Sequence, residues 1–132
     1  MIPMNSNPIP VAHPQSPNQN QKLIVPSVAA TYFFSPEEIT RLESNSNYTR
    51  IFFTNRKPLL MAKVLKKYEE VLVPMGFIRI HQSHIVNKRY ISSIEACGEV
   101  VMEDNQTITI SRRKRKAVMA ALQADARILP AA

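Results

Sequence analysis

The stretch Gly76-Phe-Ile-Arg-Ile-His-Gln-Ser-His-Ile-Val-Asn87 carries most of the information about the fold. In its first half apolar and polar side chains alternate, so that the two isoleucines face one side while Arg79 and His81 face the other. A period of two predicts a strand over residues 77–81. Ser83 is a favoured helix-capping residue type, and a short helical turn through Asn87 is therefore expected next.

The sequence after this stretch predicts three more strands and a final helix. Asp104 and Asn105 tolerate left-handed backbone angles, which suits them to a hairpin turn. Ser111 is expected to cap the last helix, in which Val118 and Leu122 share one face. The three strands are expected at residues 91–95, 99–103 and 107–111.

The sequence before this stretch predicts a short helix, a strand and a longer amphipathic helix. Ser35-Pro36-Glu37-Glu38 is typical of a helix start, with a capping serine, a proline at the first position and acids in the first turn. β-Branched and aromatic residues predict a strand over Tyr48–Thr54, after a polar loop at residues 44–47. Apolar residues at helical spacing then predict a helix that ends before Pro74. They are Leu60, Val64, Tyr68, Val71 and Leu72.

The chain divides into a tail, one domain and a short extension. Its 132 residues are enough for one domain and too few for two ordinary ones. Residues 1–30 are rich in proline, asparagine and glutamine, which predicts a disordered tail. Its function is either to bind a regulatory protein partner or to act as a passive extension. Consecutive strands joined by short turns predict a mostly β fold of the α+β class, with antiparallel strands and marginal helices. Residues 124–132 are expected to form a C-terminal extension.

Positive charge is concentrated at the start of the predicted last helix. The chain has a net charge of +7 and a pI near 9.9, and Arg112-Arg113-Lys114-Arg115-Lys116 is a run of five cations. Cations in the first turn of a helix oppose the helix dipole, which costs about 0.3–1 kcal/mol each. A bound phosphate would reverse the sign of that cost, because backbone N–H groups, dipole and side chains all favour an anion. The run therefore indicates a polyanionic partner, with an ordinary solvated charge run as the alternative.

The sequence contains neither a disulfide framework nor a membrane segment. Cys97 is the one cysteine, which fits a reducing compartment, and it is expected to be a small buried residue. No stretch approaches the roughly 20 apolar residues needed to cross a bilayer, and no secretory signal is evident. A cytoplasmic protein is expected.

A second polar cluster surrounds the end of the strand predicted at residues 77–81. Arg79 and His81 project together, and Gln82 and Ser83 follow at the turn. Arginine and glutamine form paired hydrogen bonds with base edges, while serine binds phosphates. His81 and His84 alone supply too few ligands for a metal, and Ser83 lacks the glycine-lined elbow of a catalytic nucleophile. We therefore expect no metal, no cofactor and no enzymatic activity.

The motifs of residues 76–87 resemble the signature of the LytTR family of DNA-binding domains. That signature has a phenylalanine, then Arg-x-His-x-Ser, a hydrophobic pair and an asparagine, as in residues 77–87, and a later Ser-Arg-Arg, as in residues 111–113. Leu42-Glu43 and Asn47-Tyr48 also resemble the family's first strand and loop. The resemblance covers residues 33–123. It implies short antiparallel strands in successive small sheets with one or two helices, and loops that enter successive major grooves of a duplex.

The resemblance also implies which residues contact double-stranded DNA. The family's contacts map onto the loop before Tyr48, the stretch around Gln82 and the start of the last helix near Arg112. The role of Tyr48 depends on the resemblance alone, and Asn87 is expected to hold the loop. Base contacts are expected from Tyr48, His81, Gln82 and Arg112, and phosphate contacts from Arg79, Ser83, Lys88, Arg113, Lys114 and Lys116.

The function implied by the resemblance is transcriptional regulation. Binding to direct repeats, bending of the DNA and a homodimer on DNA are further expectations from the family. Most relatives also carry a receiver domain, and this sequence contains none. The alternative function is a LytTR-like interaction module that modulates another regulator. Structured RNA is a third option, against which the absence of a basic–aromatic RNA-binding pattern argues.

Overall fold

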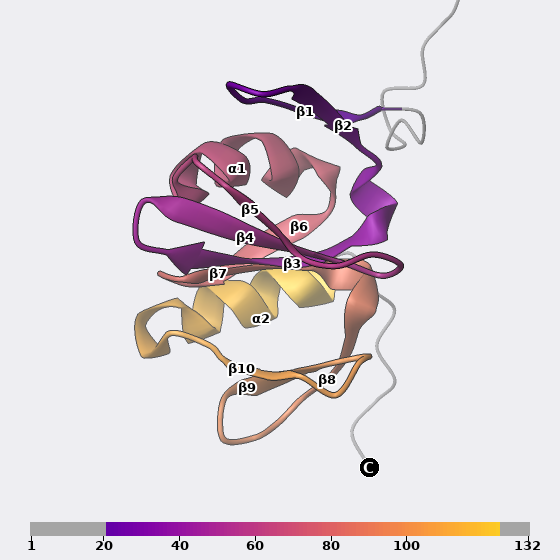
Figure 1. The fold of residues 1–132 in the computed structure, drawn as a ribbon. Coiled ribbons are helices and arrows are strands. Elements are labelled where there is room, and N and C mark those ends of the chain that lie inside the picture. The colour runs from indigo at the N-terminus through magenta and orange to yellow at the C-terminus, as the bar shows by residue number, and fades with distance from the viewer. Residues whose placement is uncertain (1–20, 125–132) are drawn as a thin grey trace, which may run out of the picture.

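A computed structural model describes residues 21–124 of the chain. These residues form ten strands in three antiparallel sheets, together with two α-helices. Figure 1 shows the layers stacked in the order hairpin, first helix, five-stranded sheet, second helix and three-stranded sheet. The central sheet therefore has a helix on each of its two faces.

The central sheet has its strands in the order β5-β4-β3-β7-β6, and each neighbouring pair is antiparallel. Two of its connections are two-residue turns, at Ser46-Asn47 and at Gln82-Ser83. Its strands are β3 (Ile39–Asn45), β4 (Tyr48–Phe53), β5 (Leu59–Met61), β6 (Phe77–His81) and β7 (His84–Asn87).

The remaining elements lie above and below this sheet (Figure 1). The helices are α1 (Leu65–Leu72) and α2 (Arg115–Ala124). The hairpin consists of β1 (Leu23–Pro26) and β2 (Thr31–Phe34), and the three-stranded sheet of β8 (Ile91–Ile94), β9 (Glu99–Met102) and β10 (Thr107–Thr109). Short 3-10 turns cover Pro36–Glu38, Val73–Met75, Lys88–Tyr90 and Arg112–Lys114.

Two hydrophobic cores lie on opposite faces of the central sheet. Phe77 and Ile85 belong to the core that includes α1 and the hairpin, while Ile78, Ile80 and Val86 belong to the core that includes α2 and the three-stranded sheet. Strands β6 and β7 are therefore apolar on both faces at their buried ends. This burial on both faces explains why residues 76–87 are the most informative part of the sequence.

The structure confirms the predicted fold class, a mostly β architecture with short antiparallel strands in several small sheets. The strand at residues 77–81 has its predicted bounds, and Asn105 adopts the expected left-handed conformation with a φ of 71°. Asn87 also has the expected structural role, since its buried amide donates to Ile39 O at 2.9 Å and its oxygen accepts from Arg89 N at 3.1 Å.

Several sequence-based predictions of secondary structure were wrong. The first two residues of the predicted loop at 44–47 belong to β3, and Ser35 and Ser111 precede 3-10 turns without a side-chain capping bond. Residues 84–87 form strand β7 rather than a helical turn, because Ile85 and Val86 are fully buried between β3 and β6. The predicted helix from Leu60 begins at Leu65, and residues 59–61 pair with β4 instead. As a result, Leu60, Val64 and Val71 of the predicted apolar stripe are exposed. Pairing with a neighbouring strand outweighed the helical period here.

The predicted disordered tail also needs a correction at its end. Residues 23–26 form strand β1, because Leu23 and Val25 alternate with exposed residues and are buried against α1 and the central sheet. The first 20 residues of the predicted tail lie outside the described residues, as does the predicted C-terminal extension apart from Ala124, which is the last residue of α2. Cys97 is exposed in the β8–β9 turn and is not the small buried residue expected.

Candidate nucleic-acid interface

Three segments that are distant in sequence meet at one edge of the central sheet. They are the β3–β4 turn, the β6–β7 turn and the start of the last helix, all toward the left of Figure 1. Two backbone hydrogen bonds join them: Ser44 N donates to Ser83 O at 2.8 Å, and Ser111 N donates to Ile80 O at 2.8 Å. We call the surface formed by these three segments the loop edge.

A β-bulge in β6 makes the second of these bonds available. The register between β6 and β7 shifts between Arg79 and His81, so that Ile80 is the extra residue. The Ile80 carbonyl accepts from Ser111 instead. Bulges are common near functional sites because they redirect the chain. Here the bulge connects the central sheet to the basic segment before α2.

The polar side chains predicted to read bases are accessible at the loop edge. Gln82 and Arg112 are exposed, and Tyr48 is 46% exposed at the first position of β4. His81 is partly exposed at the end of β6. The structure therefore brings the four predicted base-contacting residues to the same edge of the molecule.

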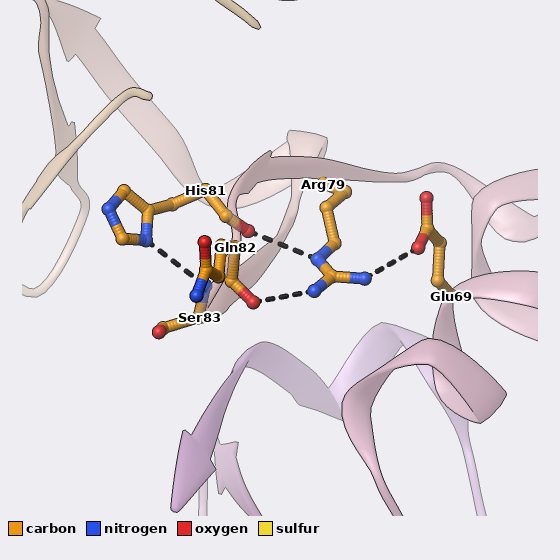
Figure 2. Close-up of polar contacts among 5 residues, drawn as sticks. All are labelled: Glu69, Arg79, His81, Gln82 and Ser83. Carbon is orange, nitrogen blue, oxygen red and sulfur yellow. Dashed lines mark hydrogen bonds and ion pairs between the residues drawn. The ribbon is translucent and has the colours of Figure 1, made fainter. Parts of the chain in front are cut away.

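The side chain of Arg79 lies beside the β6–β7 turn, between the turn and Glu69, and donates hydrogen bonds to it, as Figure 2 shows. Its Nε donates to His81 O at 3.0 Å, and its Nη2 donates to Gln82 O at 2.5 Å. Its Nη1 forms an ion pair with Glu69 Oε1 on α1 at 2.7 Å. The guanidinium is thus directed at oxygens of its own chain, and this geometry does not fit the predicted phosphate contact.

His81 is fixed in one tautomer by the turn. Its Nδ1 accepts a hydrogen bond from Ser83 N at 3.0 Å (Figure 2), so the neutral ring carries its proton on Nε2. An Nε2–H donor suits an acceptor on a base edge or a phosphate oxygen.

His84 lies beside His81, with ring centroids 5.5 Å apart. Its Nδ1 is buried and has no hydrogen-bond partner among the described residues. Burial lowers the pKa of His84 below its usual 6.5; the nearby Glu43 opposes this shift, while His81 and Arg41 add to it. His84 therefore favours the neutral state at the loop edge.

The basic run begins with a 3-10 turn over Arg112–Lys114, and α2 follows. Arg112, Arg113 and Lys116 are exposed, whereas Lys114 is half-buried. Arg115 turns back and donates from Nη2 to Cys97 O at 3.1 Å in the β8–β9 turn. Gly98 permits this approach, because a Cβ there would lie 2.0 Å from that Nη2. The run therefore combines outward cations with one arginine that holds a neighbouring turn.

One predicted phosphate contact lies elsewhere. Lys88 follows β7 at the end opposite the Gln82-Ser83 turn, and its N donates to Gly76 O at 3.1 Å. The structure does not bring Lys88 together with the other predicted contacts.

Arg50, in contrast, is an exposed cation that the prediction omitted. It lies two residues after Tyr48 on β4, so the strand period could have placed it on the same face.

The described residues contain no group of three or more histidine, cysteine, aspartate or glutamate side chains placed to hold a metal ion. Within residues 21–124, no helix has the length and apolar character needed to cross a membrane.

The fold and the loop edge define a class of protein: a small β domain that presents polar and cationic turns from successive sheets. A sequence model of the LytTr DNA-binding domain matches residues 29–123, and the chain belongs to this family. The family predicted from the sequence is therefore confirmed.

Solved and curated relatives agree with this assignment. The LytTr DNA-binding domain of a putative methyl-accepting/DNA response regulator from Bacillus cereus has a similar fold, with a TM-score of 0.60 at 18% identity over 76% of this chain and 94% of that one. Transcriptional regulatory protein LytR from Staphylococcus aureus strain N315 is 30% identical over 91 residues, 69% of this chain. LytR from strain MW2 is 31% identical over 85 residues, 64% of this chain. The chain spans 37% and 34% of the lengths of these two regulators.

Proposed function

We propose that this chain is a transcriptional regulator that binds double-stranded DNA sequence-specifically through the loop edge. The observation that carries the proposal is the pair of backbone hydrogen bonds, Ser44 N to Ser83 O and Ser111 N to Ile80 O. These bonds fix three polar turns relative to one another without a recognition helix. Fixed turns along one edge suit successive major grooves of a duplex, which lie at a fixed spacing.

Base reading is assigned to the exposed polar groups of these turns. Gln82 can pair with the N6 and N7 positions of adenine, and Arg112 with the O6 and N7 positions of guanine. His81 offers its Nε2–H, and Tyr48 its hydroxyl. Each paired contact contributes about 1–3 kcal/mol of discrimination against a wrong base.

Phosphate binding is assigned to the outward cations and to Ser83. Arg113, Lys114 and Lys116 surround the start of the last helix, where the helix dipole also favours an anion. Arg50 is added to this set because it is exposed on the same strand face as Tyr48. Arg79 and Lys88 are left out because of their position and contacts.

The test begins with a selection from random duplexes, using the purified full chain, to obtain its preferred site. Arg112→Ala should then weaken binding by about 1–3 kcal/mol and relax the preference at one base pair. Lys114→Ala should weaken binding to all sequences and lower the salt slope by about one unit.

Arg89→Ala is the matched control, since it removes an exposed cation on the 3-10 turn beyond β7, at the far end from the loop edge. Equal loss with Arg89→Ala and Arg112→Ala, or no sequence preference in the wild-type chain, would contradict the proposal.

Binding of two copies to direct repeats belongs to the same proposal. Footprinting on sites with one and two half-sites tests it, and identical affinity for both sites would refute it. The proposed place of action is the bacterial cytoplasm, where such DNA lies.

A module that acts by binding another regulator is a second candidate, favoured by one surface feature. Ile24 and Phe33 oppose each other on the outer face of the β1–β2 hairpin and are 54% and 61% exposed. Neighbouring exposed apolar residues are typical of protein contacts. An interaction module would bind DNA only weakly and without sequence preference, and competitor DNA at moderate salt would abolish that binding. The segment before residue 21, for which partner binding and a passive extension are the two alternatives, lies outside the described residues.

A further inference from the structure

The carbonyl groups of His81, the last residue of β6, and Gln82, the first residue of the β6–β7 turn, share one donor side chain. Consecutive carbonyls of a regular strand point in opposite directions, yet His81 O and Gln82 O both accept from the guanidinium of Arg79. The chain changes direction here because Gln82 is the first residue of the two-residue turn that follows β6, directly after the register shift at Ile80. Arg79 therefore holds the conformation in which Gln82 is exposed.

The charge of Arg79 is matched within the protein. Its side chain is only 18% exposed, and Glu69 Oε1 lies 2.7 Å from its Nη1. A partly desolvated, charge-assisted ion pair of this length fixes the orientation of the planar guanidinium. The other two hydrogen bonds of the guanidinium then direct Nε and Nη2 to the turn (Figure 2). Helix α1 thereby sets the position of a turn that it does not itself contribute to.

We propose that Arg79, oriented by Glu69, is a positioning residue that presents Gln82 to a base edge and does not contact DNA. This inference depends on the proposed function, because it assigns a role within the same loop edge. It adds a prediction with a counter-intuitive sign: removal of an acidic residue on α1 should weaken specific DNA binding.

Glu69→Gln tests this sign directly. The substitution makes the protein more positive, so electrostatics alone would tighten binding to any DNA. Loss of the ion pair should instead lower, by about tenfold, the preference for the selected site over a site in which the base pair read by Gln82 is changed. Glu70→Gln is the matched control, because Glu70 is exposed on the same helix and the charge change is identical.

Arg79→Lys separates positioning from phosphate contact. Lysine keeps the charge but has no planar fork to bridge two carbonyl groups. If Arg79 positions the turn, Arg79→Lys should lower the preference for the selected site about as much as Glu69→Gln does. The salt slope of binding should stay unchanged. In a double-mutant cycle, Gln82→Ala should remove most of the effect of Arg79→Lys, because both substitutions act on one contact. Thermal unfolding of each variant checks that it folds.

Two results would overturn the inference. One is a Glu69→Gln variant with wild-type or higher affinity and an unchanged base preference. The other is an Arg79→Lys variant that keeps its base preference, together with an Arg79→Gln variant whose salt slope falls by about one unit, as a phosphate contact requires.

The two proposals fail in different ways. A wild-type chain without sequence preference refutes the proposed function. Amide hydrogen exchange at residues 81–83 tests the positioning part in the absence of DNA: Glu69→Gln should speed exchange there at least several-fold relative to Glu70→Gln. Equal exchange rates in the two variants would refute the positioning role.

Discussion

Individual arginines at or near the loop edge differ in the partners of their donor groups. Arg79 and Arg115 donate to carbonyl groups of neighbouring turns, whereas Arg112 is exposed at the start of the basic run. The residue type is the same in all three cases. The sequence shows the cationic run but not which arginines are bonded within the protein. Arg79 donates to carbonyl groups two and three residues ahead, across the β6–β7 turn, and Arg115 donates to Cys97 O, 18 residues away.

His84 is a second case in which one residue has a measurable effect: it makes the free energy of unfolding depend on pH. Because its pKa is lowered in the folded state, the unfolded chain binds a proton first as the pH falls. The stability contribution of neutral His84 is therefore fully present above pH 6.5 and is lost as the pH falls below this value, through the folded-state pKa. Urea unfolding at pH 7.5 and 5.5 should show a smaller pH-dependent loss for His84→Gln than for the wild type.

The same comparison with His81→Gln identifies the histidine responsible. His84 faces Glu43 and Arg41 from β3 and His81 from β6, so removal of His81 leaves most of the burial around His84 in place. Identical pH profiles for the wild type and His84→Gln would contradict this assignment.

At the scale of elements, the local pattern predicted β6, whose residues alternate, but missed β1, which also alternates within the predicted tail, and the strands β5 and β7. Residues 77–81 have a clear period of two, and their strand was predicted with the correct bounds. Strand β7 contains Ile85, Val86 and Asn87, all buried, so it has no alternation to detect. Strand β5 is only three residues long and pairs on one side with β4.

Helix α2 should couple stability to DNA binding, because it follows the basic run directly. Val118 is its one buried residue among those described, and it packs in the core with Ile80 and Ile110. Val118→Ala should lower the free energy of unfolding by about 1.5–3 kcal/mol. It should also weaken DNA binding, since the start of the helix loses its anchor. Urea unfolding and DNA titration measure the two effects.

Val71→Ala is the control for this prediction, because it removes the same atoms from an exposed position on α1. A loss of stability as large as that of Val118→Ala would mean that burial in the α2 core does not explain the effect.

At the scale of the whole molecule, the central sheet joins the two cores into one cooperative unit. Neither core can form without β6 and β7, which contribute apolar residues to both. We therefore expect one unfolding transition, in which the most protected amides of Leu72 in one core and Val100 in the other exchange with the same free energy. Exchange measured at increasing urea concentrations tests this, and two separate limiting values would contradict it.

The sequence by itself determined the family, the mostly β class, the strand at 77–81 and the location of the cationic run, because each depends on local pattern. Only the tertiary structure decided which polar groups lie together at the loop edge. Backbone bonds from Ser44 to Ser83 and from Ser111 to Ile80 link positions that are 39 and 31 residues apart. The division between exposed Gln82 and inward-bonded Arg79 also needs the tertiary structure. The alternation of residues 77–81 specifies neither the ion pair of Arg79 with Glu69, ten residues away on α1, nor the turn that directs His81 O and Gln82 O toward the guanidinium.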